Sequence, residues 1–108
     1  MTTTPKTLIE SKLAETAQTP QYTSDNCRTA IDKFTAVNTG AANATLTVHL
    51  VPAGGAAADS NKFTKTIPPG GSWPFPDIVG HILESGDVIS TISSAVGVSI
   101  RASGRQFT

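Results

Sequence analysis

The sequence predicts a single all-β domain, a sandwich or small barrel of about five to seven short strands. Threonine, whose branched Cβ suits a pleated and half-wet surface, supplies 16 of the 108 residues. Several short segments alternate apolar and polar residues, and glycine and proline turns separate them. Only 15% of the chain is charged, against about 25% in ordinary domains. Together these observations favour strands over helices in one small domain.

Residues 1–26 differ in pattern from the rest of the chain. We interpret them as an N-terminal arm or first strand, in front of a sandwich body that covers residues 27–108. Leu8, Ile9 and Leu13 are spaced as they would be on one face of a helix, but the same stretch also fits a strand. The periodicity therefore leaves both alternatives open.

The body begins with two β runs, over residues 27–38 and 44–51, joined by a short polar turn. Two such runs predict a hairpin. In the first run the alternation fails between Ile31 and Phe34, which predicts a bulge. The second run alternates throughout and is the clearest strand of the chain, with His49 on its polar face.

Glycine and proline divide the second half of the chain into short elements. Every residue before a proline is pushed toward extended backbone, so residues 72–76 are expected to be extended. Apolar residues at helical spacing after Pro76 predict one short helical segment over Pro76–Ser85, which Gly86 ends. The other predicted elements are a loop over 52–61, a strand over 62–67, a turn at 68–71, and strands over 88–93 and 96–103.

No constellation of residues in the sequence supports catalysis or metal binding. The histidines, His49 and His81, lie far from each other and from Cys27, and no paired ligand accompanies any of them. A nucleophile-elbow motif and a phosphate-loop motif are both missing. We therefore expect a protein without enzyme activity, cofactor, metal or small-molecule substrate. Cys27 is expected to be a small, buried or half-buried apolar side chain.

The charge balance and the N-terminus restrict the partners. Formal net charge is zero, which argues against nucleic acid and anionic membranes, because both attract basic proteins. The N-terminus lacks the basic and apolar regions of a secretory signal, and the apolar stretches are too short to span a membrane. We expect the protein to be made in the cytoplasm and to stay soluble there until it meets a partner.

Aromatic and basic side chains provide candidates for a protein interface. Trp73 and Phe75 lie two apart in a proline-bracketed segment and are expected to share one face, in the core or as interface anchors. The core is favoured for at least one of them. Arg101 and Arg105 are expected on a solvated strand face or at a subunit contact. The full set of candidate interface residues is Leu8, Ile9, Leu13, Tyr22, Trp73, Phe75, Arg101 and Arg105.

Several segments, taken in order, resemble a group of small virion proteins of tailed bacteriophages and prophages, each about one hundred residues long. These segments are residues 29–39, 44–55, 67–72, 75–80, 83–87 and 100–105. The resemblance covers residues 29–108 and implies a virion component with a β-sandwich or jelly-roll body and no catalytic residues. It assigns no role to any individual residue.

Our leading hypothesis is a capsid decoration or cement protein on the outside of the virion, which binds the major capsid protein. Valine, isoleucine, leucine and phenylalanine number only 24 of 108 residues, so the core is thin and self-association as a dimer or trimer is also expected. One alternative is a tail or fibre-attachment adaptor. Another is a carbohydrate-binding or host-surface-binding module that uses Trp73 and Phe75.

Overall fold

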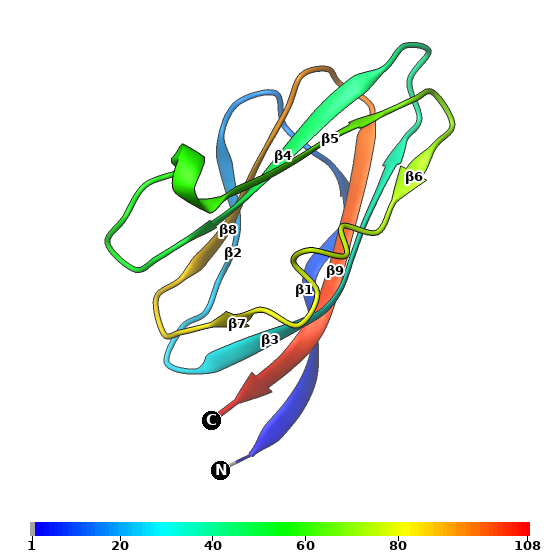
Figure 1. Ribbon diagram of the computed structural model, residues 1–108. Helices are drawn as coiled ribbons and strands as arrows, with labels where there is room; N and C mark the ends of the chain where they lie inside the picture. Colours follow the sequence, from blue (N-terminus) through cyan, green and yellow to red (C-terminus); the bar gives the residue numbers. More distant parts are fainter. Residues whose placement is uncertain (1) are drawn as a thin grey trace.

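The computed structural model describes residues 2–108, and in them nine strands form two antiparallel sheets (Figure 1). The all-β prediction is confirmed. The elements are β1 Thr3–Leu13, β2 Thr19–Thr23, β3 Arg28–Asn38, β4 Ala44–Val51, the 3-10 turn η1 Asp59–Asn61, β5 Lys62–Ile67, β6 Ser72–Trp73, β7 Ile82–Leu83, β8 Val88–Ser93 and β9 Val98–Phe107. The sequence-predicted strands over residues 44–51, 62–67 and 88–93 match β4, β5 and β8 at both ends.

The order of the strands is that of a double-sheet jelly roll. Sheet A runs β1-β9-β3-β6, with β7 also paired to β3, and sheet B runs β2-β8-β4-β5. From β1 to β4, each strand lies in the sheet opposite to the strand before it. Neighbouring strands within a sheet are therefore mostly far apart in the sequence, and the fold depends on long-range pairing.

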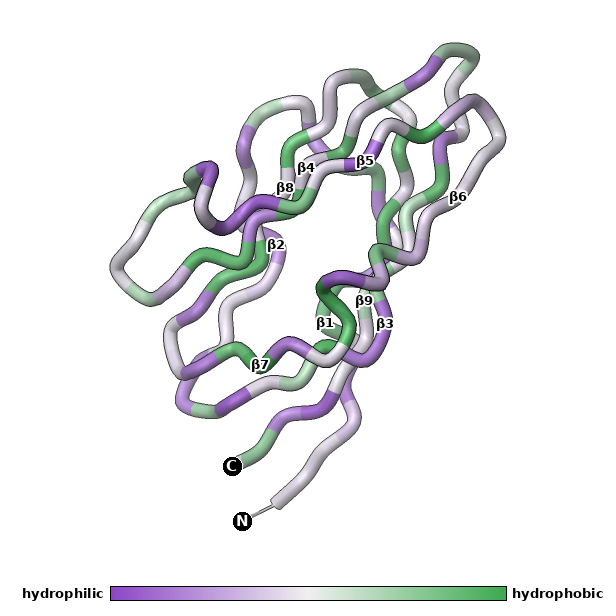
Figure 2. The backbone as a smooth tube through the Cα atoms, viewed as in Figure 1, coloured by the Kyte–Doolittle hydropathy of each residue, from purple (hydrophilic) through white to green (hydrophobic). Residues whose placement is uncertain are grey.

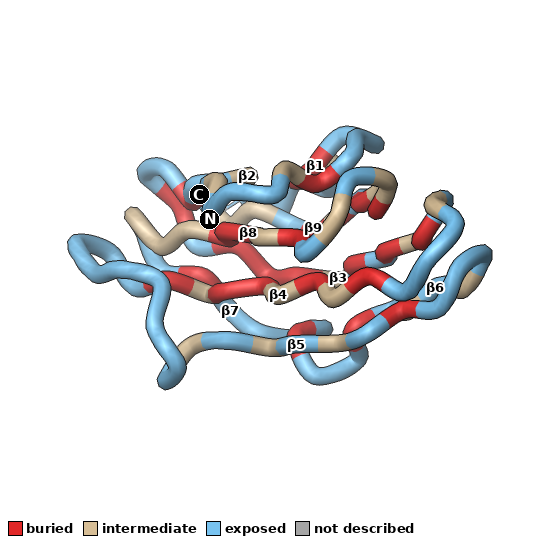
Figure 3. The backbone as a smooth tube through the Cα atoms, turned by 90° about the horizontal axis from the view of Figure 1, so that it is seen from above, coloured by how far each residue is buried: buried red, intermediate tan, exposed pale blue. Residues whose placement is uncertain are grey.

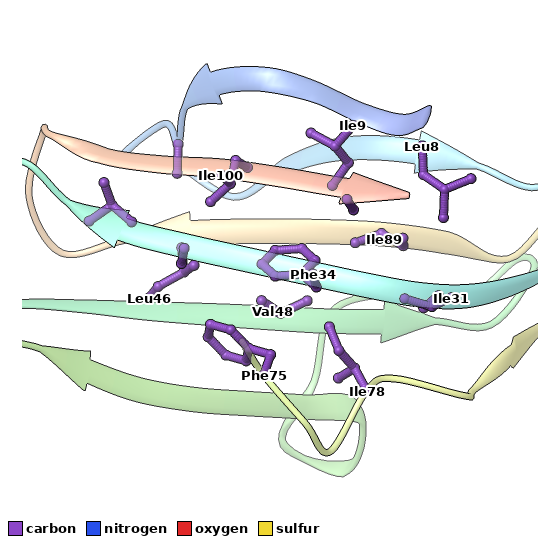
Figure 4. Packing of buried hydrophobic residues seen from close by; sticks show 14 of the residues in the cluster. Leu8, Ile9, Ile31, Phe34, Leu46, Val48, Phe75, Ile78, Ile89 and Ile100 are labelled. Carbon is purple, nitrogen blue, oxygen red and sulfur yellow. The ribbon is translucent and has the colours of Figure 1, made fainter. Parts of the chain in front are cut away.

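The core lies between the two sheets (Figure 4). Leu46 and Val48 of β4 face Phe34 of β3, and all three side chains are fully buried. Hydrophobic residues recur along the strands in Figure 2, and buried residues recur along them in Figure 3, while the loops are mostly exposed. Because side chains alternate between the two faces of each strand, the apolar ones point into the space between the two sheets.

The predicted bulge in β3 is confirmed. The pairing of β3 with β9 shifts register between Ile31 and Lys33. The extra residue turns both Ile31 and Phe34 inward, although they are three positions apart, and neither side chain is exposed.

The predicted hairpin of β3 and β4 is wrong. β3 pairs with β9, β6 and β7 in sheet A, whereas β4 pairs with β5 and β8 in sheet B. The turn at residues 39–43 crosses from one sheet to the other, so the two strands pack face to face and exchange no ladder of hydrogen bonds. Inward apolar residues satisfy either arrangement, which is why alternation alone does not separate them.

The predicted helix over Pro76–Ser85 is also wrong. Two successive turns replace it, closed by hydrogen bonds from the N–H of Ile78 to the carbonyl of Phe75 and from the N–H of His81 to the carbonyl of Ile78. Phe75 has φ of 44° and Gly80 has φ of 91°. Both angles are left-handed, so a right-handed helix cannot run through this segment, and Phe75 does not have the expected extended backbone.

Residues 3–13 form a strand rather than a helix. β1 pairs with β9 from Thr3 to Leu13, and Leu8 and Ile9 belong to the core. β1 and β2 supply an edge strand to sheet A and sheet B respectively, so the sandwich includes both sides of the sequence-based boundary at residue 26. Met1 lies outside the described residues. Just before the start of β1 and just after the end of β9, the backbones of Thr2 and Thr108 exchange two hydrogen bonds, which hold the chain ends together.

β9 differs from the predicted strand over residues 96–103. It begins at Val98 and continues to Phe107, while Val96 is 75% exposed in the preceding turn. Gly104 takes the next inward position after Ala102 and lies against the backbone of Ala30 on β3. A side chain at that position would collide with the neighbouring strand, so glycine allows β9 and β3 to stay paired.

Candidate protein interface

Three of the eight sequence-predicted interface residues lie in the core. Leu8, Ile9 and Phe75 are 6%, 2% and 2% exposed. The ring of Phe75 packs edge to face on that of Phe34, with the ring centroids 5.3 Å apart. These three side chains stabilise the sandwich and are not available at its surface, which confirms the expected core role for one member of the Trp73 and Phe75 pair.

Two further candidates are half-buried and have partners within the chain. The ammonium group of Lys65 lies 4.1 Å from the centre of the Trp73 ring. The hydroxyl of Tyr22 lies 2.9 Å from Oγ1 of Thr29, and the side-chain amide of Gln106 donates to it at 2.8 Å. Trp73 and Phe75 therefore do not form an open aromatic platform, because one ring is covered by a lysine and the other is buried.

The remaining candidates are exposed but do not form one patch. Arg105 makes a bidentate ion pair with Asp32 on sheet A, with nitrogen–oxygen distances of 3.0–3.2 Å. The guanidinium of Arg101 donates to the hydroxyl of Ser11 at 3.2 Å. Leu13 is 51% exposed at the opposite end of β1 from the chain ends.

The groups with possible chemistry are separate and have structural partners. Nδ1 of His49 lies 2.9 Å from Oδ1 of Asn61, and His49 is only 7% exposed, although it was expected on a polar face. Cys27 is buried as expected, with its sulfur 3.6 Å from the hydroxyl of Ser24. Within residues 2–108 no three His, Cys, Asp or Glu side chains gather as a metal site would require. Over the same range, no helix has the length and hydrophobicity to cross a membrane.

The outer side of sheet B carries a group of hydroxyl side chains that the sequence analysis did not single out. We call it the threonine face, and it consists of Thr45, Thr47, Thr64, Thr66, Ile92 and Ser94. Cross-strand pairing places two threonines of β4 opposite two threonines of β5. A shallow hollow of about 330 Å³ runs between β4 and β8 on this side, beside Thr16. The pattern T-x-T in two paired strands was the sequence signal for this face.

The hydroxyls of the threonine face can bind a partner's backbone. Oγ1 of Thr45 lies 2.9 Å from Oγ1 of Thr66, and Oγ1 of Thr47 lies 3.2 Å from Oγ1 of Thr64. In each pair one hydroxyl donates to the other, so one O–H and several lone pairs stay free. None of the six side chains is charged, so another protein can cover this face without burying an unpaired charge.

One end of the sandwich, which we call the loop end, consists of the turns at residues 39–43, 68–71 and 94–97. These turns contain no charged residue. The buried side chain of Asn38 connects two of them: its amide donates to the carbonyls of Ala42 and Ile67, each at 2.8 Å, and its oxygen accepts from the N–H of Gly40 at 2.9 Å. The loop end is therefore fixed by a fully paired amide.

The opposite end, where the chain ends lie, contains an apolar hollow of about 400 Å³, which we call the terminal hollow. Arg28, Ile82, Glu84 and Phe107 line it. The guanidinium of Arg28 binds both carboxylate oxygens of Glu84 at 2.8–3.1 Å. These hydrogen bonds lower the pKa of Glu84 below its ordinary value and raise that of Arg28. Ile82, although apolar, is 50% exposed there.

The fold and these surfaces define a double-sheet jelly-roll protein with an uncharged face. No protein-family model matches the chain, and no curated protein matches it. Among solved structures, a Bacillus endospore appendage chain, from a family of disulfide-linked pili, is similar to it with a TM-score of 0.60. The alignment covers 99% of this chain and 88% of that one, at 16% sequence identity. At that identity the similarity supports the jelly-roll fold.

Proposed function

We propose that this protein is a structural component of a tailed-phage virion, a decoration or cement protein that binds the major capsid protein on the outside of the shell. The observation that carries the proposal is the threonine face, whose six side chains are uncharged and include free hydroxyl groups. A decoration protein binds many equivalent sites on a shell, and at each of them this face can be buried without leaving a charge unpaired. The resemblance of residues 29–108 to small virion proteins supports the coarser assignment, a structural component of a virion.

A carbohydrate-binding or host-surface module is less well supported. It would use Trp73 and Phe75, but Lys65 covers the ring of Trp73 and Phe75 is 2% exposed. The tail or fibre-attachment adaptor stays an alternative, since it would use the same uncharged face in far fewer copies. The copy number of the protein in the virion separates it from the decoration protein.

The fold similarity to a pilus chain favours a second candidate function, a subunit of a self-assembled fibre. A disulfide link between subunits, as in that family, would need an accessible thiol. Cys27 is 7% exposed and surrounded by Ser24 and Thr29. A fibre of this protein would therefore be held together by noncovalent contacts.

The first experiment is quantitative mass spectrometry of purified virions, with the major capsid protein as the reference. A ratio near one, or another simple fraction that repeats over the whole shell, supports decoration. A ratio that fits a single vertex or tail ring supports the adaptor. Absence from the particle overturns both assignments and leaves the fibre subunit as the candidate.

A binding experiment then tests the threonine face itself. Purified protein is added to particles that lack it, and bound protein is separated by sedimentation. Thr47→Arg places a charge in the centre of the face and should weaken binding at least tenfold. Thr35→Arg, on the exposed outer side of sheet A, is the matched control and should bind normally. Equal binding by both variants would show that the shell contact lies elsewhere.

A further inference from the structure

The loop end carries the most exposed large apolar side chain of the described residues. Val96 is 75% exposed in the turn between β8 and β9, and Leu13 at the same end is 51% exposed. Exposed apolar surface of this kind commonly marks a contact with another protein.

Hydrogen bonds hold the turn of Val96 in place. The N–H of Thr39 donates to the carbonyl of Gly97 at 2.8 Å, and the hydroxyl of Thr39 donates to the same oxygen at 2.6 Å. Gly97 has φ of 116°, which favours glycine, and an added Cβ would lie 3.3 Å from the backbone nitrogen of Gly40. Val96 is thus presented by a turn that needs little ordering when it binds.

The terminal hollow offers a complementary surface at the other end of the same strand. Val96 precedes the start of β9 and Phe107 ends it, so the two lie on the order of 30 Å apart at about 3.3 Å per residue. Figure 1 shows the β8–β9 turn and the chain ends at opposite ends of the molecule. Ile82 and Phe107 provide the apolar lining, while Arg28 and Glu84 neutralise each other.

We propose that copies of this protein associate head to tail, with Val96 of one copy inserted into the terminal hollow of the next. The electrostatics favour a second copy as the occupant. The charged groups beside the hollow are already paired with each other, so the hollow favours an apolar occupant without net charge. The loop end meets both conditions, because its three turns contain no charged residue and the exposed Lys12 and Glu15 beside Leu13 neutralise each other. With zero net charge, successive copies do not repel each other.

The contact is heterologous, because it joins two different surfaces of the same chain. Such contacts form rings when the rotation between copies closes, and open filaments when it does not. The inference goes beyond shell binding, since the threonine face on sheet B takes no part in it. The head-to-tail contact would be the contact between subunits if the protein forms a fibre. Its test is independent of whether the protein also binds a phage shell.

Sedimentation velocity of the purified full chain tests the proposal with two complementary variants. Wild type should form species larger than a monomer as its concentration rises. Val96→Asp removes the inserted side chain, and Ile82→Asp places a charge in the hollow. Each variant alone should be monomeric, with self-association weakened at least tenfold. An equimolar mixture should form a one-to-one dimer and nothing larger, because it retains one intact Val96 and one intact hollow.

Val79→Asp is the matched control, since Val79 is apolar and 41% exposed but belongs to neither surface. It should associate as wild type does. Circular dichroism confirms that every variant is folded. A wild type that stays monomeric to about 1 mM, where only very weak contacts are missed, overturns the proposal. So does a Val96→Asp variant that associates normally, or a mixture that stays monomeric.

Discussion

The side-chain amide of Asn38 donates a 2.8 Å hydrogen bond to the carbonyl of Ile67, and so connects the end of β3 in sheet A to the end of β5 in sheet B. The backbone of Asn38 adds two hydrogen bonds to the turn at residues 68–71, which follows β5. Its N–H donates to the carbonyl of Gly71, and its carbonyl accepts from the N–H of Gly70. One residue thereby fixes the distance between the two sheets at the loop end.

Asn38→Ala should destabilise the protein by about 2–4 kcal/mol. The substitution leaves the carbonyls of Ala42 and Ile67 and the N–H of Gly40 without their partner, and a buried polar group left unpaired costs about 1–3 kcal/mol. Urea denaturation measures the difference. Asn43→Ala, at an exposed position of the adjacent turn, is the control. A loss below about 1 kcal/mol at position 38 would mean that water replaces the amide.

Gly104→Ala should destabilise the sandwich by about 2–3 kcal/mol, as overpacked substitutions do. The added methyl group would overlap the carbonyl oxygen of Ala30 and lie 3.0 Å from Cδ1 of Leu8. Because the first obstacle is backbone, β9 must move away from β3. Thermal unfolding provides the measurement, and Ser103→Ala, next to it on the same strand, should change stability little. Equal stability of the two variants would contradict the close approach of the strands.

Phe75→Ala should destabilise the protein by about 3–5 kcal/mol, because it empties a core position and removes the edge-to-face contact with Phe34. Trp73→Ala should have less than half of that effect, since Trp73 is only half-buried and contacts Lys65. Denaturant unfolding of the two variants compares them directly. The reverse order would place Trp73, and not Phe75, in the core.

The ion pair of Glu84 with Arg28 predicts a pH-dependent stability. The hydrogen bonds from Arg28 lower the pKa of Glu84 in the folded protein. A group of this kind contributes stability above its unfolded pKa, near 4.5, and loses it as the pH falls through the lower folded pKa. Glu84→Gln should therefore be less stable than wild type near neutral pH, and the difference in Tm should shrink below pH 4.5. The contribution is small because both side chains are exposed.

Calorimetry from acidic to neutral pH measures this difference. Glu10→Gln, at an exposed position of β1, is the control for a simple change of charge. If the difference in Tm between wild type and Glu84→Gln is the same at every pH, the ion pair with Arg28 does not lower the pKa of Glu84.

Strand positions could be predicted from the sequence because alternation and turn residues act locally. The ends of β4, β5 and β8 follow directly from apolar–polar alternation and from flanking glycines and prolines. The bulge between Ile31 and Phe34 was readable for the same reason, since a break in alternation is itself a local signal.

Pairing partners and surfaces were not predictable in this way. β3 and β4 have the pattern of a hairpin, but the choice between pairing and packing depends on Asn38 and on strands far away in the sequence. The helical spacing after Pro76 was misleading because Phe75 and Gly80 adopt left-handed backbone, which spacing does not report. The sequence also does not separate Leu8, Ile9 and Phe75 from interface residues, because apolar side chains follow the same pattern in a core and at a protein contact.

The two hydrogen bonds between Thr2 and Thr108 make the chain nearly a closed circle. A short flexible linker could join the ends without disturbing either sheet, and new ends could be opened in the exposed alanine- and glycine-rich loop at residues 53–58. Such a circular permutant would keep every strand pairing while moving its free ends to another part of the surface. The position at which a second domain is attached to this jelly roll is therefore a matter of choice.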